Sequence, residues 1–340
     1  MQISVDEKKN PSYIAEEAKG KGDAALKVCY LLCKCDPDYL GAVPSYERAA
    51  KNFGLAKRYE DEIYCREKLI LCHREIKDTY SEGRNYERIA MIYVQNLNDY
   101  DSAYKYIENA ILAFRTKGDY HYEINCLVTM AQNFKEKDKL DYAEKTLKLA
   151  HDEIAKISHI VTLSKEHSYD YIYKAMNLYC SVLILLNKLK ETINICQEFI
   201  KAFEEYEENK SKIIVFYGLI AISFILIEDE SNAGKIFEES KKICQVNSDY
   251  ETMNNISDCW NYLKQGNEER FNMALRVVDV DYDNALVKKI KAFFTYYKGK
   301  TDIKDNKGGK DKGAKLDISI KSNNSLHEKD TKGNFADAQL

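Results

Sequence analysis

The amino-acid sequence predicts an all-α protein built as a solenoid of paired helices. The main observation is a ladder of residues that recur 20 or 21 positions apart: Tyr39, Tyr59, Tyr80, Tyr100, Tyr120 and Leu140. Each of these residues opens a segment whose apolar side chains recur every three or four positions. A helix with its turn takes about twenty residues, so a helix pair repeats about every forty, which is typical of helical-repeat proteins.

The scarcity of proline supports the same fold class. The chain of 340 residues contains only Pro11, Pro37 and Pro44, so no proline interrupts a helix after residue 44. Apolar residues make up 45% of the sequence, a normal fraction for a globular protein. The formal net charge of −4 argues against nucleic acid as the main ligand.

The N-terminal residues 1–35 precede the ladder. A helix can begin at Pro11, although Gly20 and Gly22 weaken it. A second short apolar stretch covers 24–32, and Asp36-Pro37-Asp38 predicts a turn.

The ladder then predicts a regular series of helices. Because of Pro44, the first helix either starts near Val43 or is kinked. Asn98-Asp99 is a candidate N-terminal cap for the fourth helix. A longer connection is expected at 158–167. The predicted segments are 39–57, 59–77, 80–96, 100–115, 120–135, 140–157, 168–187, 189–207, 211–228, 231–245, 250–264, 268–278 and 282–297.

The longest apolar stretch, 213–227, is too short for a membrane span, which needs about twenty residues. We therefore expect a buried central helix there. Residues 298–340 differ in composition, with ten lysines, seven acidic residues and five glycines. Such a segment buries no core, so it is predicted to be a disordered tail, with Lys298-Gly299 closing the last helix.

Catalytic and metal-binding patterns are missing from the sequence. No phosphate-binding loop of the GxxxxGKT type occurs, and the ten cysteines include no CxxC pair. We find no set of nucleophile, base and oxyanion donor, so neither an enzyme nor a cofactor nor a metal site is expected. The charged N-terminus, Asp6 to Lys9, is unlike a signal peptide, so we expect a reducing, cytoplasmic location.

One run of residues resembles a known family. Asp38-Tyr39-x-x-Ala42-x-x-x-Tyr46-x-x-Ala49-Ala50-x-x-Phe53-x-x-Ala56-Lys57-x-Tyr59, followed by Cys65-Arg66-Glu67, is similar to the first well-formed hairpin of the soluble NSF-attachment proteins (SNAP adaptors), in particular their gamma class. The period of about forty also suits their hairpins better than the 34 residues of ordinary tetratricopeptide repeats (TPR). The resemblance covers residues 10–297 and is strongest over 36–150.

The resemblance implies a fold and a function. It implies a right-handed, TPR-like solenoid of about 12–14 helices. The expected domains are an N-terminal helix with a membrane-contact loop (1–35), a twisted helical-repeat sheet (36–250), a C-terminal helical bundle (251–297) and the tail (298–340). SNAP adaptors bind syntaxin-type helices of the SNARE complex and recruit the hexameric ATPase NSF, which takes the complex apart during vesicle-mediated transport. They bind membranes peripherally.

Candidate contact residues follow from the same resemblance. The membrane-contact loop would be Tyr30-Leu31-Leu32-Cys33, which could instead pack against the first hairpin. The contact with NSF would involve Asp302 and Ile303, or Leu340 at the end of the tail. Asn125 aligns with a basic SNARE-binding position of the alpha class, but it is uncharged.

Two other functions are also compatible with the sequence. One is a generic helical-repeat scaffold subunit of a multiprotein assembly. The other is an enzyme built on a helical solenoid, which would require a strongly perturbed acid or thiol in a deep pocket.

Overall fold

The computed structural model describes residues 10–27, 36–116, 118, 120–161, 168–203, 210–243, 247–278 and 284–306. The chain divides into two compact units, 1–298 and 299–340, and the fold described below belongs to the first, apart from the last residues of α14. The described residues are helical throughout, with short turns between the helices. The helices are α1 (Pro11–Ala25), α2 (Tyr39–Leu55), α3 (Tyr59–Glu75), α4 (Thr79–Ile92), the π-helical turn η2 (Tyr93–Leu97), α5 (Tyr100–Thr116), α6 (Tyr120–Glu136), α7 (Leu140–Val161), α8 (Ser168–Leu185), α9 (Leu189–Phe203), α10 (Lys210–Leu226), α11 (Glu230–Ile243), α12 (Asn247–Lys264), α13 (Glu268–Val278) and α14 (Asn284–Asn306).

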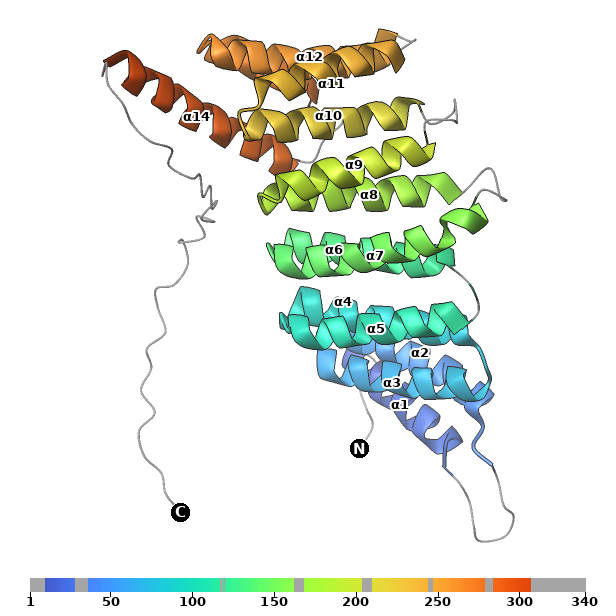
Figure 1. The fold of residues 1–340 in the computed structure, drawn as a ribbon. Helices are drawn as coiled ribbons and strands as arrows, with labels where there is room; N and C mark the ends of the chain where they lie inside the picture. The colour runs from blue at the N-terminus through green and yellow to red at the C-terminus, as the bar shows by residue number, and fades with distance from the viewer. Residues whose placement is uncertain are drawn as a thin grey trace, which may run out of the picture. The chain divides into compact units, whose positions relative to one another are not determined.

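The helices form a TPR-like solenoid of hairpins. Each helix from α1 to α12 packs against the next one along the chain, and the hairpins lie in successive layers (Figure 1). The even-numbered helices α4, α6, α8, α10 and α12 also contact one another from layer to layer. We call the side of the solenoid that they form the even-helix face. The predicted all-α helical-repeat architecture is thus confirmed.

The ladder marks the beginnings of the helices. α2, α3, α5 and α6 begin at Tyr39, Tyr59, Tyr100 and Tyr120, and α7 begins at Leu140. Asp99 caps α5 as the sequence predicted, because its carboxylate accepts the Ser102 amide at 3.0 Å. The equivalent aspartates Asp38, Asp78 and Asp229 cap α2, α4 and α11 in the same way.

Tight turns of one pattern join the helices. A residue with left-handed backbone lies two positions before the start of the next helix: Lys57, Lys77, Asn98, Gly118, Asp138, Asn187, Glu228 and Gly266. The Asp99 amide reaches back six positions, to the Tyr93 carbonyl, but in most of these turns the amide of the following residue reaches back five, as from Arg58 to the Phe53 carbonyl at 2.9 Å. This is the Schellman arrangement, which satisfies the last carbonyls of a helix. Most of these positions carry a side chain other than glycine.

Replacement of Lys77 by glycine is therefore expected to stabilise the protein by about 1 kcal/mol, since left-handed backbone is strained for a residue with a Cβ. Lys77 has a φ of 62° and its side chain is exposed. Urea unfolding should show a higher midpoint. The control, Lys105→Gly in the middle of α5, should lower stability by about 1 kcal/mol. A lower midpoint for Lys77→Gly would contradict the turn geometry.

Polar contacts join successive layers, and the two residues of each contact are about one repeat length apart in the sequence. Tyr142 donates to Asp101 at 2.5 Å, 41 residues away. Tyr106 donates to Glu67 at 2.7 Å, 39 residues away. The Lys212 ammonium meets Asp170 at 2.5 Å, 42 residues away. The repeat therefore places an acid of one layer beside a donor of the next.

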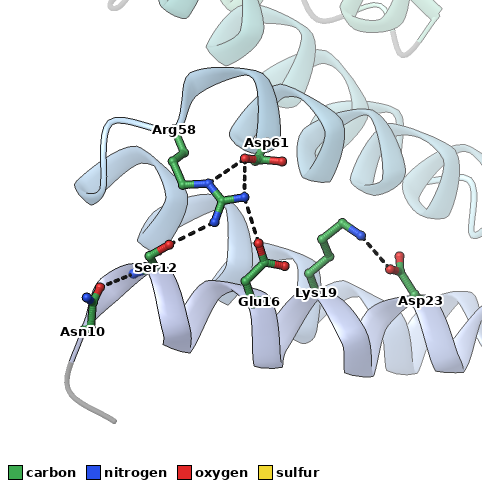
Figure 2. A network of polar contacts seen from close by, with 7 residues as sticks. All are labelled: Asn10, Ser12, Glu16, Lys19, Asp23, Arg58 and Asp61. Atoms are coloured by element: carbon green, nitrogen blue, oxygen red, sulfur yellow. Dashed lines mark hydrogen bonds and ion pairs between the residues drawn. The ribbon is translucent and has the colours of Figure 1, made fainter. Parts of the chain in front are cut away.

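The N-terminal helix α1 is held on the first hairpin by Arg58. Its guanidinium donates to Ser12 at 2.9 Å and pairs with Glu16 at 2.8 Å, both on α1, and with Asp61 at 2.6 Å on α3 (Figure 2). Tyr46 of α2 donates to Asp23 at 2.7 Å near the other end of α1. These contacts fix α1 although the chain connecting it to α2 includes residues outside the described part.

α10 is the central helix that the apolar stretch predicted. Ile213, Phe216, Leu219, Ala221 and Ile222 are at most 3% exposed, so several of its faces are buried. Among the described residues, no helix has the length and apolarity that a membrane crossing requires. The cysteines described, at 65, 72, 126, 180, 196 and 259, are buried and unpaired by disulfides.

The structure decides one open boundary and corrects two others. α2 begins at Tyr39, as the ladder predicted, and includes Pro44, so the alternative start near Val43 is wrong. The cap at Asp38 starts this helix upstream of the proline. α7 continues to Val161, into the expected connection. α14 continues to Asn306, so Lys298-Gly299 does not close it.

Candidate functional site

A groove of about 210 Å³ lies on the even-helix face, between α6 and α8. Three of its lining residues come from α6 and five from α8: Val128, Gln132, Lys135, Tyr173, Lys174, Asn177, Leu178 and Ser181. The two helices present these residues at helical spacing along their facing sides. The groove is thus a product of two helices from different hairpins.

The groove combines positive charge and apolar surface, and one of its residues holds a buried acceptor. Lys135 and Lys174 supply ammonium groups, and Val128 and Leu178 supply apolar surface. The Asn177 Oδ1 atom is buried and has no donor among the described residues. The chemistry suits an acidic polypeptide segment with some apolar side chains.

Tyr173 is placed by the next layer. Its ring packs edge-on against Phe216 of α10, with centroids 5.9 Å apart and planes at 82°. Phe216 is fully buried. The contact with Phe216 therefore orients the half-buried Tyr173 ring at the groove.

α6 is anchored by a buried carboxylate at its first turn. Glu123 is 0% exposed, and the Arg115 guanidinium at the end of α5 reaches it at 2.6 Å. Arg115 also pairs with Glu153 of α7 at 2.8 Å. Burial raises the pKa of Glu123, while the hydrogen bond and charge of Arg115 oppose this. One arginine therefore joins α5, α6 and α7.

The same anchor occurs one repeat earlier. Arg74, at the end of α3, pairs with Glu82 in the first turn of α4 at 2.8 Å. Both members stand 41 positions before Arg115 and Glu123, respectively. The even-numbered helices α4 and α6 are thus fixed by equivalent arginine–glutamate pairs.

Asn125, the position aligned with a basic residue of alpha-class adaptors, lies on α6 near α8. Its amide nitrogen is 2.8 Å from His121 Nε2. His121 in turn packs edge-on against Tyr171 of α8, at 4.9 Å between centroids. The surroundings of Asn125 are therefore polar, but the position itself lacks the positive charge of the alpha-class residue.

None of the other predicted contact residues is among the described residues that line this groove. Tyr30, Leu31, Leu32 and Cys33 lie outside the described residues, as does Leu340. Asp302 and Ile303 belong to α14, and their side chains are not described. The groove itself was not predicted, because Lys135 and Lys174 are two of several polar residues on α6 and α8 and nothing in the sequence distinguishes them.

No metal centre emerges from the described part of the chain, where no three histidine, cysteine or acidic side chains are arranged to hold an ion.

No protein-family model matches the sequence, and neither does any curated protein. Solved structures with similar helical arrangements include BtubC from P. vanneervenii, at 13% identity and a TM-score of 0.37, covering 68% of this chain and 90% of that one. A putative kinesin light chain from Podosopora anserina with TPR-like repeats has 11% identity and a TM-score of 0.37, covering 59% and 93%. NprR with its cognate peptide NprX has 14% identity and a TM-score of 0.35, covering 88% and 84%. TM-scores this low add nothing on function.

Proposed function

We propose that this protein is a helical-repeat scaffold that binds another protein along the even-helix face and has no catalytic role. The groove between α6 and α8 supports this proposal most directly. It combines two lysines with two aliphatic side chains, which suits an acidic amphipathic helix.

The specific form that we propose is a SNAP-type adaptor. Its partners would be the SNARE complex, the NSF ATPase and, peripherally, the membrane surface. This part of the proposal rests on the similarity over residues 38–67. Ala42, Tyr46, Ala49, Ala50 and Phe53 from that run are all buried, at most 1% exposed. They therefore also serve packing, so the partner must be tested directly.

Reversal of both groove charges, Lys135→Glu with Lys174→Glu, is expected to weaken SNARE-complex binding about tenfold or more and to reduce its salt dependence. The measurement is binding of purified SNARE complex at two salt concentrations. The matched control is Lys105→Glu, an exposed lysine of α5, which should leave binding unchanged.

An assay of SNARE-complex disassembly distinguishes the adaptor function from that of a generic scaffold. Purified SNARE complex, NSF and ATP are incubated with this protein as the sole adaptor. ATP-dependent disassembly that the double reversal abolishes would support the adaptor. A protein that neither binds nor disassembles several SNARE complexes, yet captures another acidic helical protein through Lys135 and Lys174, would be a scaffold of the generic kind.

A further inference from the structure

Two cysteine thiols lie in contact inside the hairpin of α8 and α9. Cys180 of α8 and Cys196 of α9 are both 0% exposed, and the Cys196 thiol donates a hydrogen bond to the Cys180 sulfur, with the two Sγ atoms 3.4 Å apart. Both are free thiols, and neither lines the groove. Cys65 and Cys72, by contrast, lie seven residues apart on α3, about 10 Å of helix rise, so they cannot meet in this way.

The separation of the two sulfurs is close to that of a disulfide. A disulfide bond joins sulfurs about 2.05 Å apart, so Cys180 and Cys196 would have to approach by about 1.3 Å. α8 and α9 are consecutive helices joined by a tight turn at residues 186–188, which keeps their facing sides together. An approach this small is within the reach of side-chain rotation and a slight movement of the helices.

The fold protects the two thiols from bulky reagents and from ionisation. Burial raises the pKa of the Cys196 thiol well above its usual value, and the hydrogen bond to Cys180 raises it further. Since the thiolate is the reactive form, the closed hairpin reacts slowly. The reaction therefore requires a small, uncharged oxidant and a brief local opening of the hairpin, during which one thiol can ionise.

We propose that Cys180 and Cys196 form a redox-active pair, which hydrogen peroxide converts into a disulfide that joins α8 to α9. In the first step one thiolate attacks the peroxide and breaks its O–O bond, which gives a sulfenic acid and hydroxide. The hydroxide takes up the proton that the thiol lost and becomes water. In the second step the other thiol attacks the sulfenic sulfur, the S–S bond forms, and the sulfenic oxygen leaves with that thiol's proton as a second water. The two sulfurs lose two electrons, which reduce the peroxide.

Mass spectrometry of the full-length protein tests the assignment directly. The folded protein is treated with hydrogen peroxide, its remaining thiols are alkylated in urea, and the product is digested with trypsin. The peptides 175–188 and 191–201 carry Cys180 and Cys196, and we expect them to be joined by a disulfide. Dithiothreitol should separate them again by thiol–disulfide exchange. The peptides that carry Cys65 and Cys72 should not be joined to each other.

Urea unfolding measures the effect of the disulfide on the fold. The bond closes a loop between residues 180 and 196 and lowers the entropy of the unfolded chain, so the urea midpoint of the oxidised protein should rise by about 1 M. Cys180→Ala and Cys196→Ala should each lose this rise, because one thiol alone cannot form the bond. Cys259→Ala removes another buried cysteine and should keep the rise.

The opposite results would overturn the proposal. Recovery of the two peptides separately, either alkylated or oxidised to sulfinic acid, would show that the pair does not close. An unchanged urea midpoint would contradict a disulfide between α8 and α9, and an equal rise in both alanine variants would assign the effect to other cysteines. If an alanine variant does not fold, the peptide analysis of the wild type decides. Because none of these assays involves a protein partner, their outcome is independent of the groove and of SNARE binding.

Discussion

Replacement of Arg115 by alanine is expected to lower the free energy of unfolding by about 3 kcal/mol, because it leaves a buried carboxylate without its counter-charge. Glu123 is fully buried, and one of its oxygens, Oε2, already has no partner among the described residues. Arg115 itself is 43% exposed, so water offsets part of the loss. The measurement is urea unfolding at neutral pH.

A double variant and a surface control test the physical cause. Arg115→Ala combined with Glu123→Gln should recover part of the lost stability, because the buried group no longer needs to ionise. Arg88→Ala removes an exposed arginine of α4 whose side chain contacts the Met91 sulfur at 3.8 Å, and should change stability by less than about 0.5 kcal/mol. Equal effects of Arg115→Ala and Arg88→Ala would show that Glu123 does not depend on Arg115.

Protein stability is expected to rise between pH 8 and 10.5 through Lys289. This lysine of α14 is 1% exposed and donates to the Leu185 carbonyl at 2.9 Å and to Asn187 Oδ1 at 2.6 Å. Burial lowers the pKa of Lys289 from 10.5 to about 8. Between these values the unfolded chain binds more protons than the folded one, so stability rises with pH across this window. Below about pH 8 both states carry the charged lysine, and the contribution of Lys289 no longer changes with pH.

The Lys289→Met variant should lack this pH dependence. The difference in unfolding free energy between wild type and variant should grow by about 3 kcal/mol in favour of the wild type from pH 8 to 10.5. Comparison with the variant is needed because tyrosines and other lysines also titrate in this range. Lys291→Met, at an exposed position of the same helix, should follow the wild type. A constant difference between wild type and Lys289→Met would contradict a lowered pKa.

The local pattern of the sequence predicted most helices well. The ladder residues begin α2, α3, α5, α6 and α7, because the spacing of apolar positions is set by a single helix and its turn. The turns were harder to predict, since lysine, aspartate and glutamate occupy left-handed positions where glycine would have given a signal. The length of α14 was missed because Gly299 was expected to end it.

The sequence predicted much less of the candidate sites than of the fold. The predicted membrane and NSF contact residues all came from a family resemblance, and they lie outside the described residues or, for Asp302 and Ile303, near the end of α14. The groove requires α6 and α8 to lie side by side, and the thiol pair requires Cys180 and Cys196 to meet between α8 and α9. Neither arrangement leaves a mark at a single position in the sequence.

The sequence by itself determined that this protein is an all-α repeat of helical hairpins, because helix formation and burial of one face depend on residues three or four positions apart. The tertiary structure alone decided which polar groups are buried and what they meet. Lys289 finds its acceptors 102 and 104 residues earlier in the chain. Such contacts depend on how the layers stack, and the energy of a buried charge or donor is set by its three-dimensional surroundings.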